Sequence, residues 1–284
     1  MELNRLYHPI TATPFRNDHT YREAAPAHAL LRPWIRCLWG GLPCATPASP
    51  HPVIPDTCTD IIFRISTHTG VITADYCALN DKPFFSGSTA ASGIELFAIR
   101  FYPWAAQLFM QDSLSGSLNL SYDARQHFPA LVRPLLRMLA ETEDFDMRCM
   151  RAEAILLAHL DQAVLRAPLM NAMADMLQTR GRLRVTELAA HNQVSTRQLE
   201  RFFHEHTGVS PKKLSELIRY QYLWREAASS PAFDVQDAVF RYGYADQSHL
   251  LRQFKQYHGM TLSQAIAFAQ ANVGFVQYNR LESR

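Results

Sequence analysis

Two stretches of the chain place several polar side chains on one face of an expected helix, where they can form hydrogen bonds with planar groups such as DNA bases. The first stretch offers Thr196, Arg197, Glu200 and Arg201, and the second offers Gln247, Ser248, His249, Arg252 and Gln253. An arginine fork donates two parallel hydrogen bonds, whereas a glutamine amide donates and accepts at once. These groups match the donor and acceptor patterns that base pairs present in the major groove of double-stranded DNA.

The two stretches belong to an internal repeat with an offset of 51 residues. LERFFHEHTG at 199–208 aligns with LLRQFKQYHG at 250–259, with leucine, arginine, phenylalanine and glycine at matching positions. The alignment extends upstream, where Ser195 falls on Asp246 and Asn192 falls on Gly243. A repeat of this kind predicts two copies of one helix-turn-helix unit.

Each unit has the residue types that turn the chain between two helices and end the second one. In the first unit, Asn192 is the turn residue, Ser195 the N-cap and Gly208 the terminating glycine. In the second unit, Gly243, Asp246 and Gly259 have the same three roles. Gln198 adds capping-box spacing to Ser195. We expect a left-handed backbone at Asn192 and Gly243, because asparagine and glycine tolerate it best.

The second helix of each unit is predicted to be amphipathic. Its apolar face comprises Leu199, Phe202 and Phe203 with His206 at the edge in the first unit, and Leu250, Phe254 and Tyr257 in the second. Two ordinary helical hairpins with solvated outer faces would give a similar pattern, and Glu200 and Gln256 fit that alternative. The matching caps and turns favour a pair of reading helices.

A single helix is predicted to connect the two units. Ser210 is a suitable N-cap, Pro211 suits the first turn, and the sequence up to Ser229 lacks a helix breaker. A helix of this length spans about 28 Å. It can hold two reading helices about 34 Å apart, which is one turn of DNA.

These stretches resemble the AraC/XylS family of transcription regulators over about 80 residues. The resemblance lies in VSTRQLERFFHEHTGVSPKKLSELIRYQ at 194–221 and VFRYGYADQSHLLRQFKQYHG at 239–259. It implies that DNA bases are read by Arg197, Glu200 and Arg201 in the first unit and by Ser248, His249 and Arg252 in the second. It also implies RNA polymerase as a partner. The chain departs from the family at Leu262, where proline is usual, which affects the expected start of the last helix.

Composition and charge agree with a DNA-binding protein without proving it. The 284 residues are 48% hydrophobic and 19% charged, which is ordinary for a globular protein. Residues 181–258 contain 11 Lys and Arg against 8 Asp and Glu, whereas residues 1–180 contain 15 against 17. We expect a cytoplasmic protein that has no membrane partner, since the sequence shows neither a signal peptide nor a membrane-spanning run.

The overall fold class is predicted to be α+β in three parts. Residues 1–122 are expected to form a β-rich sensing or dimerisation domain, residues 123–178 a helical linker or dimerisation region, and residues 179–284 an all-α domain with both helix-turn-helix units. Strands are predicted at 59–65, 70–74 and 94–101, a short helix at 104–110, and two or three helices after 123. Pro134 and Pro168 are expected to kink or break these helices.

The N-terminal part resembles, more distantly, a β-rich domain found in some of these regulators. The similar stretches are 27–40, 51–65 and 97–109, and a cupin-like barrel is an analogy at the level of fold. Core packing is the default explanation for most of the aromatic residues there, and an effector pocket lined by them is the alternative: Trp34, Trp39, Phe63, Phe85, Phe101, Tyr102 and Trp104. The sequence does not identify which residues would bind an effector.

Cys37, Cys44, His51 and Cys58 recur every seven residues. This is not the paired spacing of structural zinc sites, so we expect buried, inert thiols rather than a metal or redox site. The alternative is a cysteine-based sensor for alkyl transfer, thiols or metals, with Arg36 beside Cys37 as an activating neighbour.

The sequence therefore predicts a regulator controlled by a small-molecule effector or by homodimerisation through its N-terminal part. A constitutive regulator that only dimerises there is a further option. The residues predict no enzyme, no catalytic group, no metal ligand and no cofactor.

Overall fold

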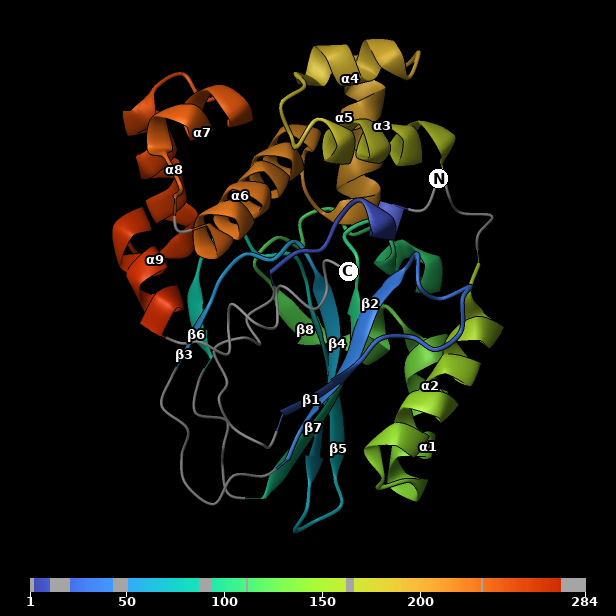
Figure 1. Ribbon diagram of the computed structural model, residues 1–284. Coiled ribbons are helices and arrows are strands. Elements are labelled where there is room, and N and C mark those ends of the chain that lie inside the picture. The colour runs from blue at the N-terminus through green and yellow to red at the C-terminus, as the bar shows by residue number, and fades with distance from the viewer. Residues whose placement is uncertain are drawn as a thin grey trace.

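The N-terminal half is built around a twisted antiparallel sheet (Figure 1). The computed structural model describes residues 3–10, 21–42, 51–86, 93–110, 112–161, 166–230 and 232–271. The six-stranded sheet has the order β1 (Tyr21–Ala24), β2 (Ile35–Gly41), β7 (Ile94–Phe101), β4 (Thr59–Ser66), β5 (Ile72–Cys77) and β8 (Ser121–Asp123). A second, two-stranded sheet pairs β3 (His51–Val53) with β6 (Phe84–Ser86).

The strand register gives the large sheet one apolar face. Ile61 of β4 pairs with Ile99 of β7, which pairs with Leu38 of β2, so these side chains share a face. On the same face, the Phe97 ring contacts Phe145, with 6.2 Å between the ring centroids. Phe145 begins helix α2 (Phe145–His159), and α1 (Pro129–Glu141) packs beside α2. These two helices therefore cover the apolar face (Figure 1).

The remaining helices form the C-terminal half. They are α3 (Ala167–Gln178), α4 (Val185–His191), α5 (Thr196–Thr207), α6 (Pro211–Ser229), α7 (Val235–Tyr242), α8 (Gln247–His258) and α9 (Leu262–Ala271). Helix α3 contacts α4, α5 and α6, and its Leu169, Met173 and Met176 are fully buried. In the described residues, no helix is both long enough and apolar enough to span a membrane.

The α+β fold class is confirmed, and the predicted elements are close to the observed ones. The predicted strands at 59–65 and 94–101 match β4 and β7. Three α-helices lie in the described residues between 123 and 178, with Pro134 inside α1 and Pro168 in the first turn of α3. Neither proline breaks its helix.

Two predicted elements are wrong in detail. The strand expected at 70–74 begins later, as β5, because Gly70 takes φ 69° in the turn that precedes it. The helix expected at 104–110 is only a short 3-10 helix, Ala106–Phe109. Trp104 lies in the turn before it, where its indole Nε1 donates to the Pro33 carbonyl at 2.9 Å.

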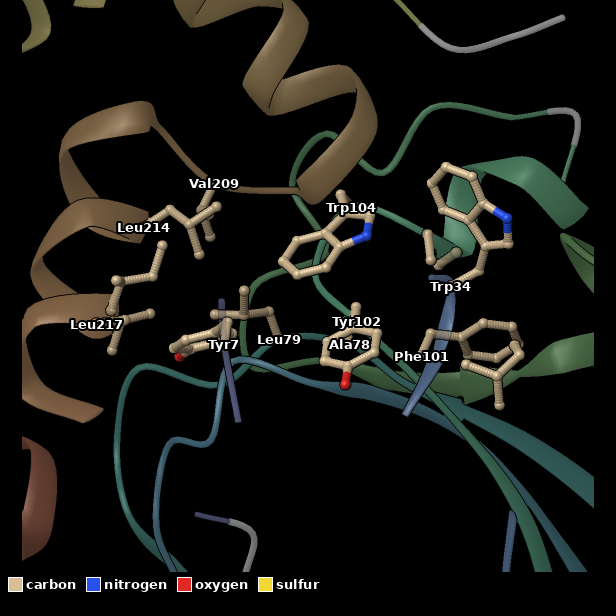
Figure 2. Close-up of a cluster of buried hydrophobic side chains, with 14 of the residues drawn as sticks. Tyr7, Trp34, Ala78, Leu79, Phe101, Tyr102, Trp104, Val209, Leu214 and Leu217 are labelled. Carbon is tan, nitrogen blue, oxygen red and sulfur yellow. The ribbon is translucent and has the colours of Figure 1, made fainter. Parts of the chain in front are cut away.

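The two halves share one continuous hydrophobic core. Figure 2 shows Tyr7, Leu79 and Trp104 of the N-terminal half beside Val209 and Leu214 of the C-terminal half. All five side chains are at most 4% exposed. Because the apolar surfaces of both halves are buried against each other, the relative position of the halves is defined by packing.

Removing α3 is expected to destabilise the C-terminal half. Its Leu169, Met173 and Met176 are fully buried, and α3 contacts α4, α5 and α6, so deleting α3 uncovers apolar surface on these helices. Exposing a buried aliphatic side chain costs about 1.5–3 kcal/mol. A fragment starting at residue 166 should therefore melt at a clearly higher temperature than one starting at 179. Thermal unfolding followed by circular dichroism tests this, and equal melting temperatures would contradict the assignment of α3 to this half.

Candidate nucleic-acid interface

The first helix-turn-helix unit, α4 and α5, has the predicted cap at its second helix. Ser195 Oγ accepts from the Gln198 backbone N–H at 3.2 Å, and Gln198 Oε1 accepts from the Ser195 N–H at 3.0 Å. Gly208 ends α5 in the left-handed conformation, with φ 77°. The predicted capping box and terminating glycine are confirmed.

The second unit, α7 and α8, is capped in the same way. Asp246 Oδ1 accepts from the His249 N–H at 2.7 Å, and Gly259 ends α8 with φ 83°. Gly243 takes φ 66° at the end of α7, as predicted.

The predicted left-handed turn residue of the first unit is wrong. Asn192 has φ −97°, and its neighbour Gln193 is the left-handed residue, with φ 53°. The Asn192 amide instead donates to the Leu188 carbonyl at 2.8 Å, which satisfies a carbonyl at the end of α4.

The turn of the second unit, between α7 and α8, has one residue more than the turn of the first unit, between α4 and α5. The Val194 N–H donates to the Ala189 carbonyl, and the Tyr244 N–H donates to the Val239 carbonyl, so these helix ends correspond at an offset of 50. The N-caps of α5 and α8 correspond at an offset of 51. Ala245 is therefore an insertion, and an alignment at 51 throughout misplaces the turn residue by one.

The predicted reading residues of α5 lie mainly on its free face. Arg197, Glu200 and Arg201 are exposed, and Thr196 is half-buried. The Arg201 guanidinium lies 5.5 Å from the Phe202 ring centroid and has its Nε 3.8 Å from Glu205 Oε1. These weak contacts orient the guanidinium at the surface without sequestering it.

The predicted reading residues of α8 differ more in their exposure to solvent. Gln247, Ser248 and Arg252 are exposed, whereas His249 and Gln253 are half-buried. The His249 ring packs edge-on against Tyr244, with 5.4 Å between centroids. Gln253 Oε1 is buried without a hydrogen-bond partner in the described part of the chain, so its amide is partly turned away from solvent.

His206 is more buried than the sequence predicted. It is 8% exposed rather than lying at the edge of the apolar face, and Phe202 is only half-buried. Burial lowers the pKa of His206, which keeps the imidazole neutral near pH 7.

Helix α6 connects the units with the predicted bounds, Pro211–Ser229. Ser210 Oγ accepts from the Lys213 N–H at 3.2 Å at its start. Figure 1 shows α5 and α8 on opposite sides of α6. Helix α9 begins at Leu262 without the usual proline, since Thr261 and Gln264 cap each other through the same reciprocal pair of hydrogen bonds.

The cysteines of the N-terminal half are packed, as predicted, at Cys37 and Cys58. Both are buried, and burial raises the pKa of each thiol well above its usual value. Arg36 lies 3.6 Å from Glu23, so its charge is already opposed. Cys44 and the side chain of His51 lie outside the described residues.

The candidate aromatic pocket residues are part of packed structure. Trp34, Trp39, Phe63, Phe101, Tyr102 and Trp104 are all buried. The Tyr102 and Trp104 rings stack with 4.8 Å between centroids and an interplanar angle of 3°. The side chain of Phe85 lies outside the described residues.

Sequence reasoning missed a buried ion cluster on the second face of the large sheet. Arg100 Nε and Nη2 donate to the two oxygens of Asp60 at 2.9 and 3.1 Å, and Trp39 Nε1 donates to the same carboxylate at 2.9 Å. Arg100 Nη1 lies 3.6 Å from Asp56, whose pKa is raised by burial. Polar residues inside a mostly apolar strand were the only signal for it.

Substitutions at the first turn test the corrected geometry. Gln193→Gly removes the cost of a left-handed side-chain residue and should stabilise the protein by about 0.5–1 kcal/mol. Asn192→Gly removes the hydrogen bond to Leu188 and should destabilise it. Chemical denaturation measures the free energy of unfolding of both variants. A stabilised Asn192→Gly variant together with a destabilised Gln193→Gly variant would show that Asn192 is the left-handed residue.

Comparisons with known proteins identify two regions. Residues 188–267 match a family described as a helix-turn-helix domain, and residues 22–121 match a domain of unknown function (DUF6597). No curated protein sequence matches the chain.

Solved structures of low identity also match. An AraC-type transcriptional regulator from Chromobacterium violaceum is 20% identical over 36% of this chain and 91% of its own, with a TM-score of 0.34. ToxT from Vibrio cholerae is 12% identical over 76% of this chain and 91% of its own, with a TM-score of 0.38. ToxT bound to an unsaturated fatty acid is 11% identical over 74% and 86%, with a TM-score of 0.39.

The family match begins within α4, at residue 188, and extends through α5, α6, α7 and α8 into α9. The chain therefore joins a domain of unknown function, at residues 22–121, to a helix-turn-helix domain, at residues 188–267.

Proposed function

We propose that the protein is a sequence-specific transcription regulator whose single chain reads two successive major-groove segments of double-stranded DNA. The observation that carries this proposal is the pair of exposed polar faces on α5 and α8, held on opposite sides of α6. Helix α6 has 19 residues, a length of about 28 Å. That length suits two reading helices about one DNA turn apart.

The proposed base readers are the exposed members of each face. They are Arg197, Glu200 and Arg201 on α5, and Gln247, Ser248 and Arg252 on α8. Thr196, His249 and Gln253 are half-buried and act at the edge of the contact. Because the two sets differ in chemistry, the proposed operator half-sites differ in sequence, and one protein chain reads an asymmetric site.

The N-terminal half is proposed to control DNA binding through a small-molecule effector or through dimerisation. Support comes from the shared core and from the hydrogen bonds of Gln221 and Tyr222 in α6 to Ile10, Pro55 and Leu6, which give the N-terminal half a direct contact with the helix between the two units. The proposal includes action in the cytoplasm, activation of transcription and RNA polymerase as a partner. The burial of Cys37 and Cys58 supports packed thiols over reactive ones in this half.

Replacing a base-reading arginine is expected to weaken specific binding. Arg201→Ala or Arg252→Ala should each cost about 1–3 kcal/mol if the guanidinium reads a base, with relaxed specificity at that base pair. Binding is measured by titration of a duplex enriched from a random pool with the wild-type protein.

Arg133→Ala is the matched control, because Arg133 is an exposed arginine on α1 in the other half. It should bind like the wild type. Unchanged affinity and unchanged base preference in both reading variants would contradict the site assignment.

A further inference from the structure

The N-terminal half presents a loop platform to the helix-turn-helix units, here defined as residues 78–83 and 112–120. Asp81 and Asn119 tie its two loops together, because the Asp81 N–H donates to Asn119 Oδ1 at 3.0 Å and Asn119 Nδ2 donates to Asp81 Oδ1 at 2.9 Å. The Asn119 N–H also donates to the Leu79 carbonyl at 2.9 Å. The two loops therefore behave as one surface.

The platform contacts the end of the first reading helix. The Leu114 N–H donates to the Glu205 carbonyl in the last turn of α5, at 2.9 Å. At Gly208, which ends α5, an added Cβ would lie 2.5 Å from Ser117 Oγ and 3.0 Å from the Leu114 carbonyl oxygen. The backbone of the first unit thus lies directly against the loop at 112–120.

The same platform contacts the second unit and the start of α6. At Gly259, which ends α8, an added Cβ would lie 3.1 Å from Pro83 Cγ. Lys213 in the first turn of α6 has its Nζ 2.9 Å from Asp81 Oδ2, and the same Nζ lies 5.5 Å from the Tyr257 ring centroid of α8. The Asp81 carboxylate therefore joins the platform to the region where α6 and α8 meet.

These contacts create a second connection between the two units, in addition to α6. A connection through one helix leaves two bodies free to swivel about its ends, whereas a second connection closes a loop and removes that freedom. The platform contacts the C-terminal ends of α5 and α8, while Arg197 and Ser248 near their N-terminal ends stay exposed. The platform can therefore hold both readers without covering the groups that face DNA.

We propose that Asp81, Asn119 and Lys213 are positioning residues that set the spacing between the two reading helices, and so the number of base pairs between the two half-sites. This inference rests on the proposed function as a two-segment DNA reader. Inserting one base pair moves a half-site by about 3.4 Å and turns it by about 35° around the duplex. A rigid pair of readers discriminates against that change, and a pair free to swivel tolerates it.

The experiment measures spacing preference with the full-length chain. Wild-type protein is first used to enrich a duplex from a random pool, and derivatives are made with one base pair inserted or removed between the half-sites. Affinity is then measured for Asp81→Asn, which keeps an acceptor for Asn119 but loses the charge, and for Lys213→Met, which keeps the aliphatic stem.

The expected result is a loss of spacing discrimination in both single variants, by about 2- to 30-fold. Asp146→Asn is the control, since its ion pair with Arg22 lies at an exposed site of the N-terminal half, with the Asp146 side chain 72% exposed. It should keep the wild-type preference.

Two results would overturn the inference. Single variants that lose affinity equally for all spacings would show a general loss of stability or charge, and variants with wild-type preference would show that α6 alone sets the spacing. Both outcomes leave the proposed function intact, because the wild-type protein has enriched a duplex. A wild-type protein that enriches none would overturn the proposed function and this inference with it.

Discussion

Gln221 lies in the middle of α6 with 2% of its surface exposed, so its amide must find hydrogen-bond partners inside the protein. Its Oε1 accepts from the Ile10 N–H at 2.7 Å, and its Nε2 donates to the Pro55 carbonyl at 2.6 Å. Losing such partners leaves a buried polar group unsatisfied, which costs about 1–3 kcal/mol. These hydrogen bonds therefore hold the helix that joins the two helix-turn-helix units against the N-terminal half.

Neighbouring contacts extend this dependence along α6. The Tyr222 hydroxyl donates to the Leu6 carbonyl at 2.6 Å, and Arg225 Nη1 donates to the His8 carbonyl at 3.1 Å. Pro55 directly precedes Asp56, which lies beside the buried Arg100. Asp56 of the ion cluster is thus adjacent along the chain to Pro55, whose carbonyl accepts a hydrogen bond from Gln221 in the middle of α6.

The sequence predicted best what local chemistry decides. Ser195, Asp246 and Ser210 cap helices where their types and spacing indicated, because a cap depends on a few adjacent residues. Strand β7 was predicted with its observed bounds because β-branched and aromatic residues are flanked by breaks. Gln193 was missed because an inserted residue in the other unit shifts the repeat by one.

The contacts between the halves could not be predicted from the sequence. Gln221 and Ile10 are 211 residues apart, and nothing in either local pattern indicates the other. Gly208 was expected only to end a helix, yet its lack of a side chain also lets the loop at 112–120 pack closely against it. The exposed polar faces of α5 and α8 were predictable, since exposure on an amphipathic helix follows from its period. The burial of His206 and the half-burial of His249 and Gln253 depend on tertiary packing.

Methylation interference on the duplex enriched by the wild-type protein tests the central claim most directly, since it reports which guanine N7 atoms in the major groove must stay free. The account predicts two separate groups of sensitive guanines, about one helical turn apart on one face of the duplex, bound by a single chain. One group alone, or interference confined to the minor groove, would contradict the claim that both units of one chain read DNA together.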